Sequence, residues 1–373
     1  MFLAINEIRH ERLRYALVVL VVLLISYLVF FLAGLSNGLA HENRSAIDSW
    51  NADEVVLSDD SNGTLAMSSL DSSQISQIKA QSKAVLSQRS AVVETDADGS
   101  GSDGNTSKID ASLLGISRDG FLAPAVSQGR MFSSEGEVVV DLTFASRYGV
   151  RLGDRLDVAR SDGGKLKVVG FTRDAQLSVA PVVYMSSATF DGLFSSSTVT
   201  SSGAGASSGT VSSNSTVNAV VVRGTVSHAP SDVSVSSISD FINDLPGYRA
   251  QVLTFGLMIG FLIAIAAMVV GVFIYVLTLQ KRAVFGVMKA QGISDGFLGR
   301  SIVAQTMILS LTGVLVGALA TWGTSAVLPD AVPYRTDAML VSLSGALLVV
   351  SALAAALFSV RVISRIDPVE AIG

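Results

Sequence analysis

Four long stretches without a charged residue constrain this chain more than any other feature of its sequence. They cover residues 15–39, 250–280, 301–329 and 338–360. Each is longer than the roughly 20 residues that an α-helix needs to cross about 30 Å of hydrocarbon. Charged residues make up only 15% of the chain, whereas soluble proteins usually carry about 25%. We therefore predict four transmembrane helices, at 14–39, 250–280, 301–329 and 338–360.

Lysine and arginine residues predict how these spans are oriented. Nine of them lie in the first 14 residues, the 281–300 loop and the 361–373 tail, whereas the loop between the third and fourth spans holds Arg335 alone. Cytoplasmic loops carry the excess of positive charge. Both termini and the 281–300 loop are thus predicted to be cytoplasmic, and residues 40–249 extracytoplasmic. Residues 1–13 mix apolar and charged side chains, which favours a short amphipathic helix at the cytoplasmic face of the membrane.

The segment 40–249 has the pattern of an α+β domain. Alternating apolar and polar residues predict short strands at 53–58, 136–141, 166–171, 181–185 and 217–222. Helical spacing is found at 72–88 and 234–245. Two stretches rich in Ser and Gly, 96–107 and 195–215, cannot bury an apolar face and are expected to be surface loops.

Several kinds of chemistry are excluded. The chain has no cysteine and three histidines, so it holds no thiolate zinc site, iron–sulfur cluster or disulfide. It has no G-x-x-x-x-G-K-[ST] loop to bind ATP, and no catalytic constellation. The net charge of −5 argues against a nucleic-acid binder. Because the spans contain no charged residue, a carrier driven by protons or sodium is also disfavoured.

Three glycine pairs follow the G-x-x-x-G spacing within the predicted spans: Gly34/Gly38, Gly256/Gly260 and Gly313/Gly317. This spacing lets helix backbones approach closely, and we interpret it as tight helix packing. The first pair also fits the G-x-S-x-G pattern of hydrolases. That pattern has meaning only at a strand-to-helix turn, and here it lies at the end of a membrane helix.

Two segments predicted to be cytoplasmic carry a family resemblance. Residues 280–294 read Gln-Lys-Arg-Ala-Val-Phe-Gly-Val-Met-Lys-Ala-Gln-Gly-Ile-Ser, and residues 363–372 end in Asp-Pro-Val-Glu-Ala-Ile. Both resemble signatures of FtsX/MacB-type permeases, the four-helix membrane subunits of type VII ABC transporters. Residues 149–154 resemble the MacB-like periplasmic domain of that family. One departure is Ala283-Val284, where the family usually has a basic and an acidic residue.

The N-terminal residues 6–17 and 26–40 resemble the HrtB/DevC-like branch of this family, which includes haem-efflux permeases. The resemblance implies a transporter subunit rather than an enzyme, in the plasma membrane of a bacterium. It implies a fold of four transmembrane helices with a MacB-like α+β extracytoplasmic domain between the first two. It also implies partners: a second copy of the permease, two copies of an ABC ATPase that carries ATP and Mg²⁺, membrane lipid, and haem as cargo. No intrinsic cofactor and no nucleic acid are expected.

The family implies that the 281–300 loop is a coupling segment docked on the ATPase, together with part of the tail. Its apolar residues have helical spacing and are expected to anchor it, and its bases flank them. The residues predicted to couple are Lys281, Arg282, Val284, Phe285, Val287, Met288, Lys289, Pro368 and Glu370. The alternative is an ordinary amphipathic connector.

Haem-efflux permeases of this kind are thought to take haem into a site formed by the outer ends of the first two spans. Such a site needs an apolar slot and an iron ligand. The residues predicted there are Tyr27, Phe31, Asn37, His41, Glu42, Phe255 and Met258. His41, Glu42 and Met258 are the candidate iron ligands, and no other metal site is predicted. The competing interpretation is that the aromatics are interfacial anchors and that the methionine serves packing.

Two other functions fit the same architecture. The cargo could be a different amphipathic molecule, such as a peptide, a lipid or a drug. Alternatively, the chain could resemble FtsX in transmitting ATPase motion to proteins outside the membrane, and its outer domain would then bind a protein. A neighbouring ATPase gene would not separate these hypotheses, whereas cargo-dependent resistance would.

Overall fold

The computed structural model describes residues 12–95, 107–159, 161, 165–194, 217–281, 284, 286–288, 291–329 and 332–363. The chain divides into two compact units. We call residues 1–38 with 251–373 the membrane unit, and residues 39–250 the sheet unit. The amphipathic helix predicted at 1–13 lies outside the described residues except for its last two positions.

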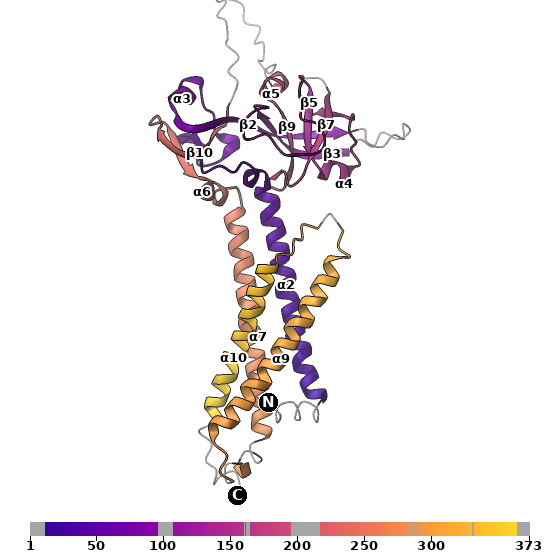
Figure 1. The fold of residues 1–373 in the computed structure, drawn as a ribbon, viewed down its shortest axis with the longest axis vertical. Coiled ribbons are helices and arrows are strands. Elements are labelled where there is room, and N and C mark those ends of the chain that lie inside the picture. Colours follow the sequence, from indigo (N-terminus) through magenta and orange to yellow (C-terminus); the bar gives the residue numbers. More distant parts are fainter. Residues whose placement is uncertain are drawn as a thin grey trace, which may run out of the picture. The chain divides into compact units, whose positions relative to one another are not determined.

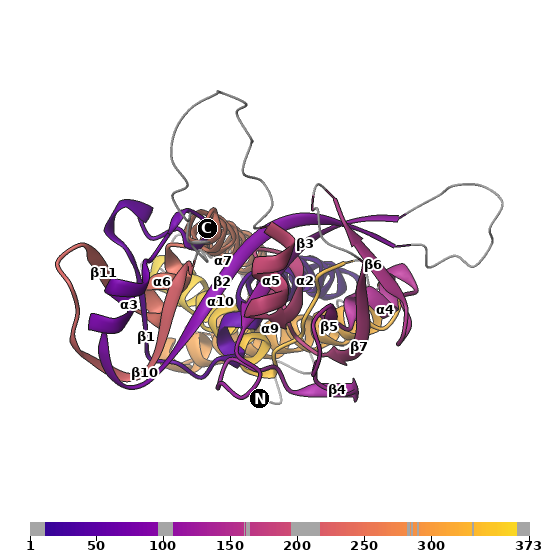
Figure 2. The same ribbon diagram turned by 90° about the horizontal axis from the view of Figure 1, so that it is seen from above.

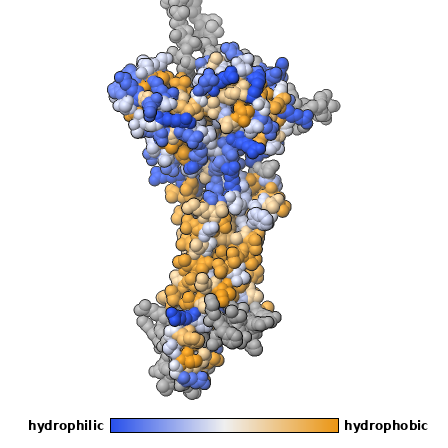
Figure 3. Space-filling model, in the orientation of Figure 1, coloured by the Kyte–Doolittle hydropathy of each residue, from blue (hydrophilic) through white to orange (hydrophobic). Residues whose placement is uncertain are grey.

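The membrane unit is built from four long helices (Figure 1): α2 (Arg12–Ser49), α7 (Tyr248–Gln280), α9 (Asp295–Ser325) and α10 (Ala338–Ile363). All four are long and apolar enough to cross a membrane, which confirms the four predicted spans. Figure 3 shows apolar side chains gathered over these helices and polar ones over the sheet unit. Their ends differ from the predicted limits, most of all in α2. It continues past residue 39 to Ser49, and no glycine or proline interrupts it after Gly38.

Close contacts between helices explain one of the glycine pairs. A Cβ on Gly313 would lie 2.6 Å from Val22 of α2, and one on Gly317 would lie 2.1 Å from the hydroxyl oxygen of Ser26. That hydroxyl also contacts the Gly313 carbonyl oxygen at 3.2 Å. The pair on α9 therefore serves close packing against α2. By contrast, no atom of the described chain lies within 4 Å of a Cβ on Gly256 or Gly260.

The sheet unit contains a mixed sheet (Figures 1 and 2) in the order β11-β1-β10-β2-β3-β9-β5-β7-β4, with β6 beside β2 and β7, and β8 beside β9. The pairs β3–β9 and β5–β7 are parallel and the others antiparallel. The strands are β1 (Glu54–Ser58), β2 (Lys79–Thr95), β3 (Ser107–Ile116), β4 (Val126–Gly129), β5 (Glu137–Asp141), β6 (Arg155–Val158), β7 (Leu166–Thr172), β8 (Gln176–Leu177), β9 (Ala180–Ser186), β10 (Ala219–His228) and β11 (Val233–Ser237). The helices are α3 (Ser72–Gln77), α4 (Thr143–Tyr148), α5 (Ser187–Phe194) and α6 (Ile238–Asn243), with 3-10 turns η1 (Asp59–Ser61) and η2 (Leu65–Met67). This arrangement confirms an α+β region between the first two spans.

Two helix predictions in this unit were wrong in part. The helix predicted over 72–88 is α3 alone, capped by Asp71, and β2 follows from Lys79. Residues 79–86 of this strand pair with β10 and residues 87–95 pair with β3, and this pairing outweighs the helical spacing. The helix predicted over 234–245 begins as strand β11, and α6 starts only where the Ser237 side chain caps it. Of the two Ser/Gly-rich stretches, only Ser107 is among the described residues.

Glu137, at the start of β5, gives the sheet unit a predictable response to acid. Arg130 and the backbone N–H of Ser133 donate to its carboxylate, which lowers the pKa of Glu137 from 4.5 to about 2. A carboxylate whose pKa is lower in the folded state stabilises the fold at pH values above its unfolded-state pKa. This contribution is lost as the pH falls through the folded-state pKa. Between pH 4.5 and pH 2, we expect the free energy of unfolding to fall more in the wild type than in Glu137→Gln.

The fluorescence of Trp50 during chemical unfolding in detergent measures this effect, because Trp50 is buried in the sheet unit. The chain has two tryptophans, so the experiment uses a Trp322→Phe background. The control is Asp157→Asn, an exposed carboxylate on β6, which should keep the wild-type pH dependence. Equal pH dependence in Glu137→Gln and the wild type would contradict the prediction.

Candidate functional site

The aromatic residues predicted on the first span pack against other parts of the membrane unit. Tyr27 and Phe31 lie one turn apart on α2, with ring centroids 6.1 Å apart and planes inclined by 16°. Phe31 also stacks on Tyr334, from the segment between α9 and α10, at 5.6 Å. The Tyr27 hydroxyl lies 3.2 Å from that of Thr324 on α9. These rings form one aromatic stack that joins α2 to α9 and to the α9–α10 segment.

The α9–α10 segment contacts α2 at its first glycine pair. A Cβ on Gly34 would lie 2.4 Å from the Tyr334 ring, and one on Gly38 would lie 2.0 Å from a backbone oxygen of the segment. The N–H of Arg335 donates to the Gly34 carbonyl at 3.1 Å, and Asn37 Nδ2 donates to the Arg335 carbonyl at 3.4 Å. Tyr334 was not among the residues predicted from the sequence. The sequence signal that could have identified it is an aromatic residue in a short loop, together with a pair of glycines at G-x-x-x-G spacing near the end of the first span.

Phe255 and Met258 lie on α7, on a side that the described chain covers poorly. Phe255 is half-buried, Met258 is exposed, and no α7 residue between 251 and 262 is buried. In the described residues, Phe255 makes no ring contact with the aromatic stack. This part of α7 therefore presents an apolar face for lipid, cargo or another protein chain to cover.

His41 and Glu42 lie near the end of α2, within the sheet unit, and each contacts a side chain of that unit. His41 Nε2 lies 3.2 Å from Asp174 Oδ1, and Arg147 donates to Glu42 Oε1 at 3.2 Å. The seven predicted cargo residues thus lie in three places. Tyr27, Phe31 and Asn37 lie where α2 contacts α9 and the α9–α10 segment. Phe255 and Met258 lie on the α7 face, and His41 and Glu42 in the sheet unit.

The predicted coupling segment is described only in part. Residues 284 and 286–288 are helical, with Val284 and Val287 exposed and Met288 half-buried. Lys281, just before them, donates to the hydroxyl of Tyr15 on α2 at 3.3 Å. Arg282, Phe285, Lys289, Pro368 and Glu370 lie outside the described residues. The exposed valines are available to a partner, and Lys281 links the end of α7 to α2.

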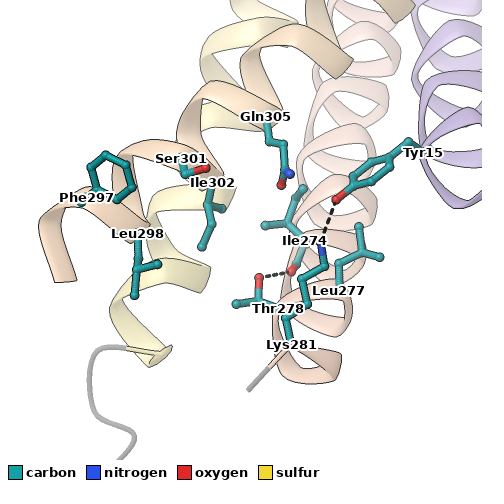
Figure 4. A pocket seen from close by; sticks show the side chains of 10 residues that line it. All are labelled: Tyr15, Ile274, Leu277, Thr278, Lys281, Phe297, Leu298, Ser301, Ile302 and Gln305. Carbon is teal, nitrogen blue, oxygen red and sulfur yellow. Dashed lines mark hydrogen bonds between the residues drawn. The ribbon is translucent and has the colours of Figure 1, made fainter. Parts of the chain in front are cut away.

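A small cavity lies beside this link (Figure 4), between the end of α7 and the first turns of α9. Its polar lining includes Tyr15, Thr278, Lys281 and Gln305, and its volume is about 20 Å³. A space of that size holds about one water molecule, so it is too small for a cargo. A larger open hollow of about 730 Å³ lies along β2 and β3, and its lining mixes charged side chains, such as Arg89 and Asp110, with apolar ones, such as Val92 and Phe194.

Comparison with known proteins finds a family model that matches part of the chain and relatives that match all of it. Residues 256–368 match the FtsX-like permease C-terminal domain. This chain is similar over its full length to proteins with the provisional name hemin transport system permease protein HrtB. That of Staphylococcus haemolyticus is 24% identical over 377 residues, and one from Staphylococcus epidermidis is 25% identical over 379 residues. Each alignment covers all of this chain and 99% of the relative.

A further relative is an ABC transporter permease of Mycobacterium tuberculosis that its name calls uncharacterized. It is 24% identical over 379 residues, which is all of this chain and 99% of the relative. The matched domain covers most of α7 and all of α9 and α10. The four spans, with a sheet-rich region between the first two, are consistent with an FtsX-like permease. The chain carries an FtsX-like permease domain and is homologous to HrtB, and it is the permease subunit of an ABC transporter.

Proposed function

We propose that this permease exports haem. The observation that carries the proposal is full-length similarity to relatives named for hemin transport. An ATPase subunit, which the family of this chain implies, would supply the energy. The permease itself would bind haem from the membrane and release it outward. Both termini would be cytoplasmic and the sheet unit extracytoplasmic.

The apolar face of α7 supports a second copy of this chain as a further partner. Leu253, Leu257 and Phe261 are exposed there, and Gly256 and Gly260 offer open space for another backbone. Small residues at this spacing allow helices to approach closely in membranes. Two permease chains with two ATPases would bury these side chains against each other or against cargo.

The proposed haem contacts are chemically suited to an amphipathic porphyrin. The ring stack of Tyr27 and Phe31 and the α7 residues Phe255 and Met258 offer apolar and soft surfaces. His41 supplies an imidazole, which is a common iron ligand. Another flat amphipathic molecule would find the same apolar surfaces, so a different cargo is the second candidate.

An absorption titration of the purified, detergent-solubilised permease with haemin tests the proposal. We expect a saturable shift of the Soret band, at about one haem per pair of permeases, that empty micelles do not give. A spectrum no different from that of haemin in micelles would contradict haem export. The assignment as a permease would stand in that case, and other amphipathic cargoes would be titrated next.

A further inference from the structure

The two neighbouring candidate ligands on α2, His41 and Glu42, differ in how they are held. The Glu42 carboxylate accepts a charged hydrogen bond from Arg147, and its side chain is only 13% exposed. The His41 side chain is 28% exposed, and its partner in the described structure is Asp174, at Nε2. To bind iron, Glu42 would have to break its ion pair with Arg147, which is largely shielded from solvent. His41 would have to give up only a contact with an exposed carboxylate. His41 is therefore the more accessible ligand.

Asp174 is held beside His41 by the backbone that follows it. The N–H of Gln176 donates to the Ser45 hydroxyl at 2.9 Å. The N–H groups of Ser178 and Val179 donate to the carbonyl oxygens of Asn43 (2.9 Å) and Glu42 (3.1 Å). The segment 174–179 is thus fastened to the same part of α2 that carries His41. This fastening brings the Asp174 backbone close to His41.

The same segment has an unfavourable backbone. Asp174, Ser178 and Val179 have φ values of 54°, 52° and 67°, in the left-handed region that non-glycine residues rarely adopt, and a β-branched residue such as Val179 least of all. Ser178 and Val179 form the two-residue turn between β8 and β9, where Asn-Gly is the preferred pair. Such conformations persist only where the surroundings hold them, and they gather at ligand clamps and switch regions.

The geometry also decides which ring nitrogen a haem would use. Nε2 is farther from the backbone than Nδ1, so a planar macrocycle reaches Nε2 with less crowding. In this structure Nε2 is the nitrogen that contacts Asp174. Haem iron and the Asp174 carboxylate therefore need the same atom, and they cannot hold it together.

We propose that Asp174 competes with haem iron for His41 Nε2, and so weakens haem binding enough to favour release. This inference rests on the proposed function, which it deepens. When haem binds, the Asp174 contact opens, any proton on Nε2 passes to solvent water, and Nε2 donates its lone pair to iron while Nδ1 carries the single proton of the neutral ring. When the iron leaves, the Asp174 contact re-forms. The Asp174 side chain is 55% exposed, so water can solvate its carboxylate when the contact with His41 opens.

The competition predicts that removing Asp174 strengthens haem binding, whereas a merely structural role would weaken it. Asp174→Gly removes the carboxylate and accepts a positive φ without strain. A net hydrogen bond contributes about 1 kcal/mol, so we expect about fivefold tighter haem binding and slower haem transfer to an acceptor such as apomyoglobin. Asp174→Asn keeps an acceptor but no charge and should give a smaller change of the same sign. His41→Ala should remove the absorption signature of histidine ligation, and added imidazole should restore it.

Asp157→Asn, on β6, is the matched control and should bind haem as the wild type does. Thermal unfolding of each variant shows that it is folded. Unchanged or weaker haem binding by both Asp174 variants would overturn the competition, as would a wild-type spectrum in His41→Ala. If the wild-type permease binds no haem at all, the proposed function fails instead, and the two failures are thus distinguishable.

Discussion

Gly317→Leu is expected to break the packing of α9 on α2 and to leave little folded permease. A Cβ at this position would lie 2.1 Å from the Ser26 hydroxyl oxygen and 3.1 Å from the carbonyl oxygen of Leu23. The distance to the Ser26 oxygen is far shorter than a van der Waals contact. The Leu23 oxygen belongs to the backbone of α2, which cannot move aside. Overpacking of a well-packed core typically costs about 1–3 kcal/mol. We expect a larger loss here, because leucine adds three further carbons beyond Cβ.

The measurement is thermal unfolding of the detergent-solubilised chain, with its elution profile as a check on aggregation. Gly260→Leu is the matched control, since it makes the same change in another membrane helix where no described atom lies within 4 Å of the new Cβ. It should unfold as the wild type does. If a second copy packs on α7, Gly260→Leu should lower the fraction of dimer without destabilising the chain. Equal unfolding temperatures for Gly317→Leu and the wild type would contradict the observed contact.

The membrane spans were predictable because their signal is local. An uncharged run of more than 20 residues has few folded alternatives, and the four helices follow from it. The end of α2 was not predictable in the same way. Residues 40–49 include His41, Glu42 and Arg44, and their charge looks like the start of a loop. They remain helical because the sheet unit holds them, through Asn43 and Ser45 among others.

Strand β2 shows a second limit of sequence analysis. Residues 72–88 have helical spacing throughout, yet only Ser72–Gln77 is helical, because the rest pairs with β3 and β10. The β10 residues that pair with Lys79 to Leu86 lie more than 130 positions away in the sequence. The partners of the candidate site are equally distant. Nothing local to His41 predicts its contact with Asp174, and nothing local to Phe31 predicts Tyr334.

Val287→Asp is expected to uncouple the permease from its ATPase. Val284 and Val287 are 57% and 51% exposed on the helical residues that follow α7, and the family implies an ATPase subunit for them to contact. If these valines dock in an apolar pocket of that subunit, a carboxylate at 287 would be buried without a partner, which costs several kcal/mol. We expect at least a hundredfold weaker association, and no stimulation of ATP hydrolysis by cargo.

Co-purification of the ATPase with a tagged permease measures the association, and haem titration of the permease alone shows that the cargo site is intact. Val235→Asp is the matched control, because Val235 on β11 is 41% exposed in the sheet unit and no coupling role is proposed for it. It should keep both the complex and the stimulated hydrolysis. A stable complex of Val287→Asp with normal stimulation would show that residues 284–288 are an ordinary connector. Loss of the complex with haem binding retained would separate coupling to the ATPase from recognition of the cargo.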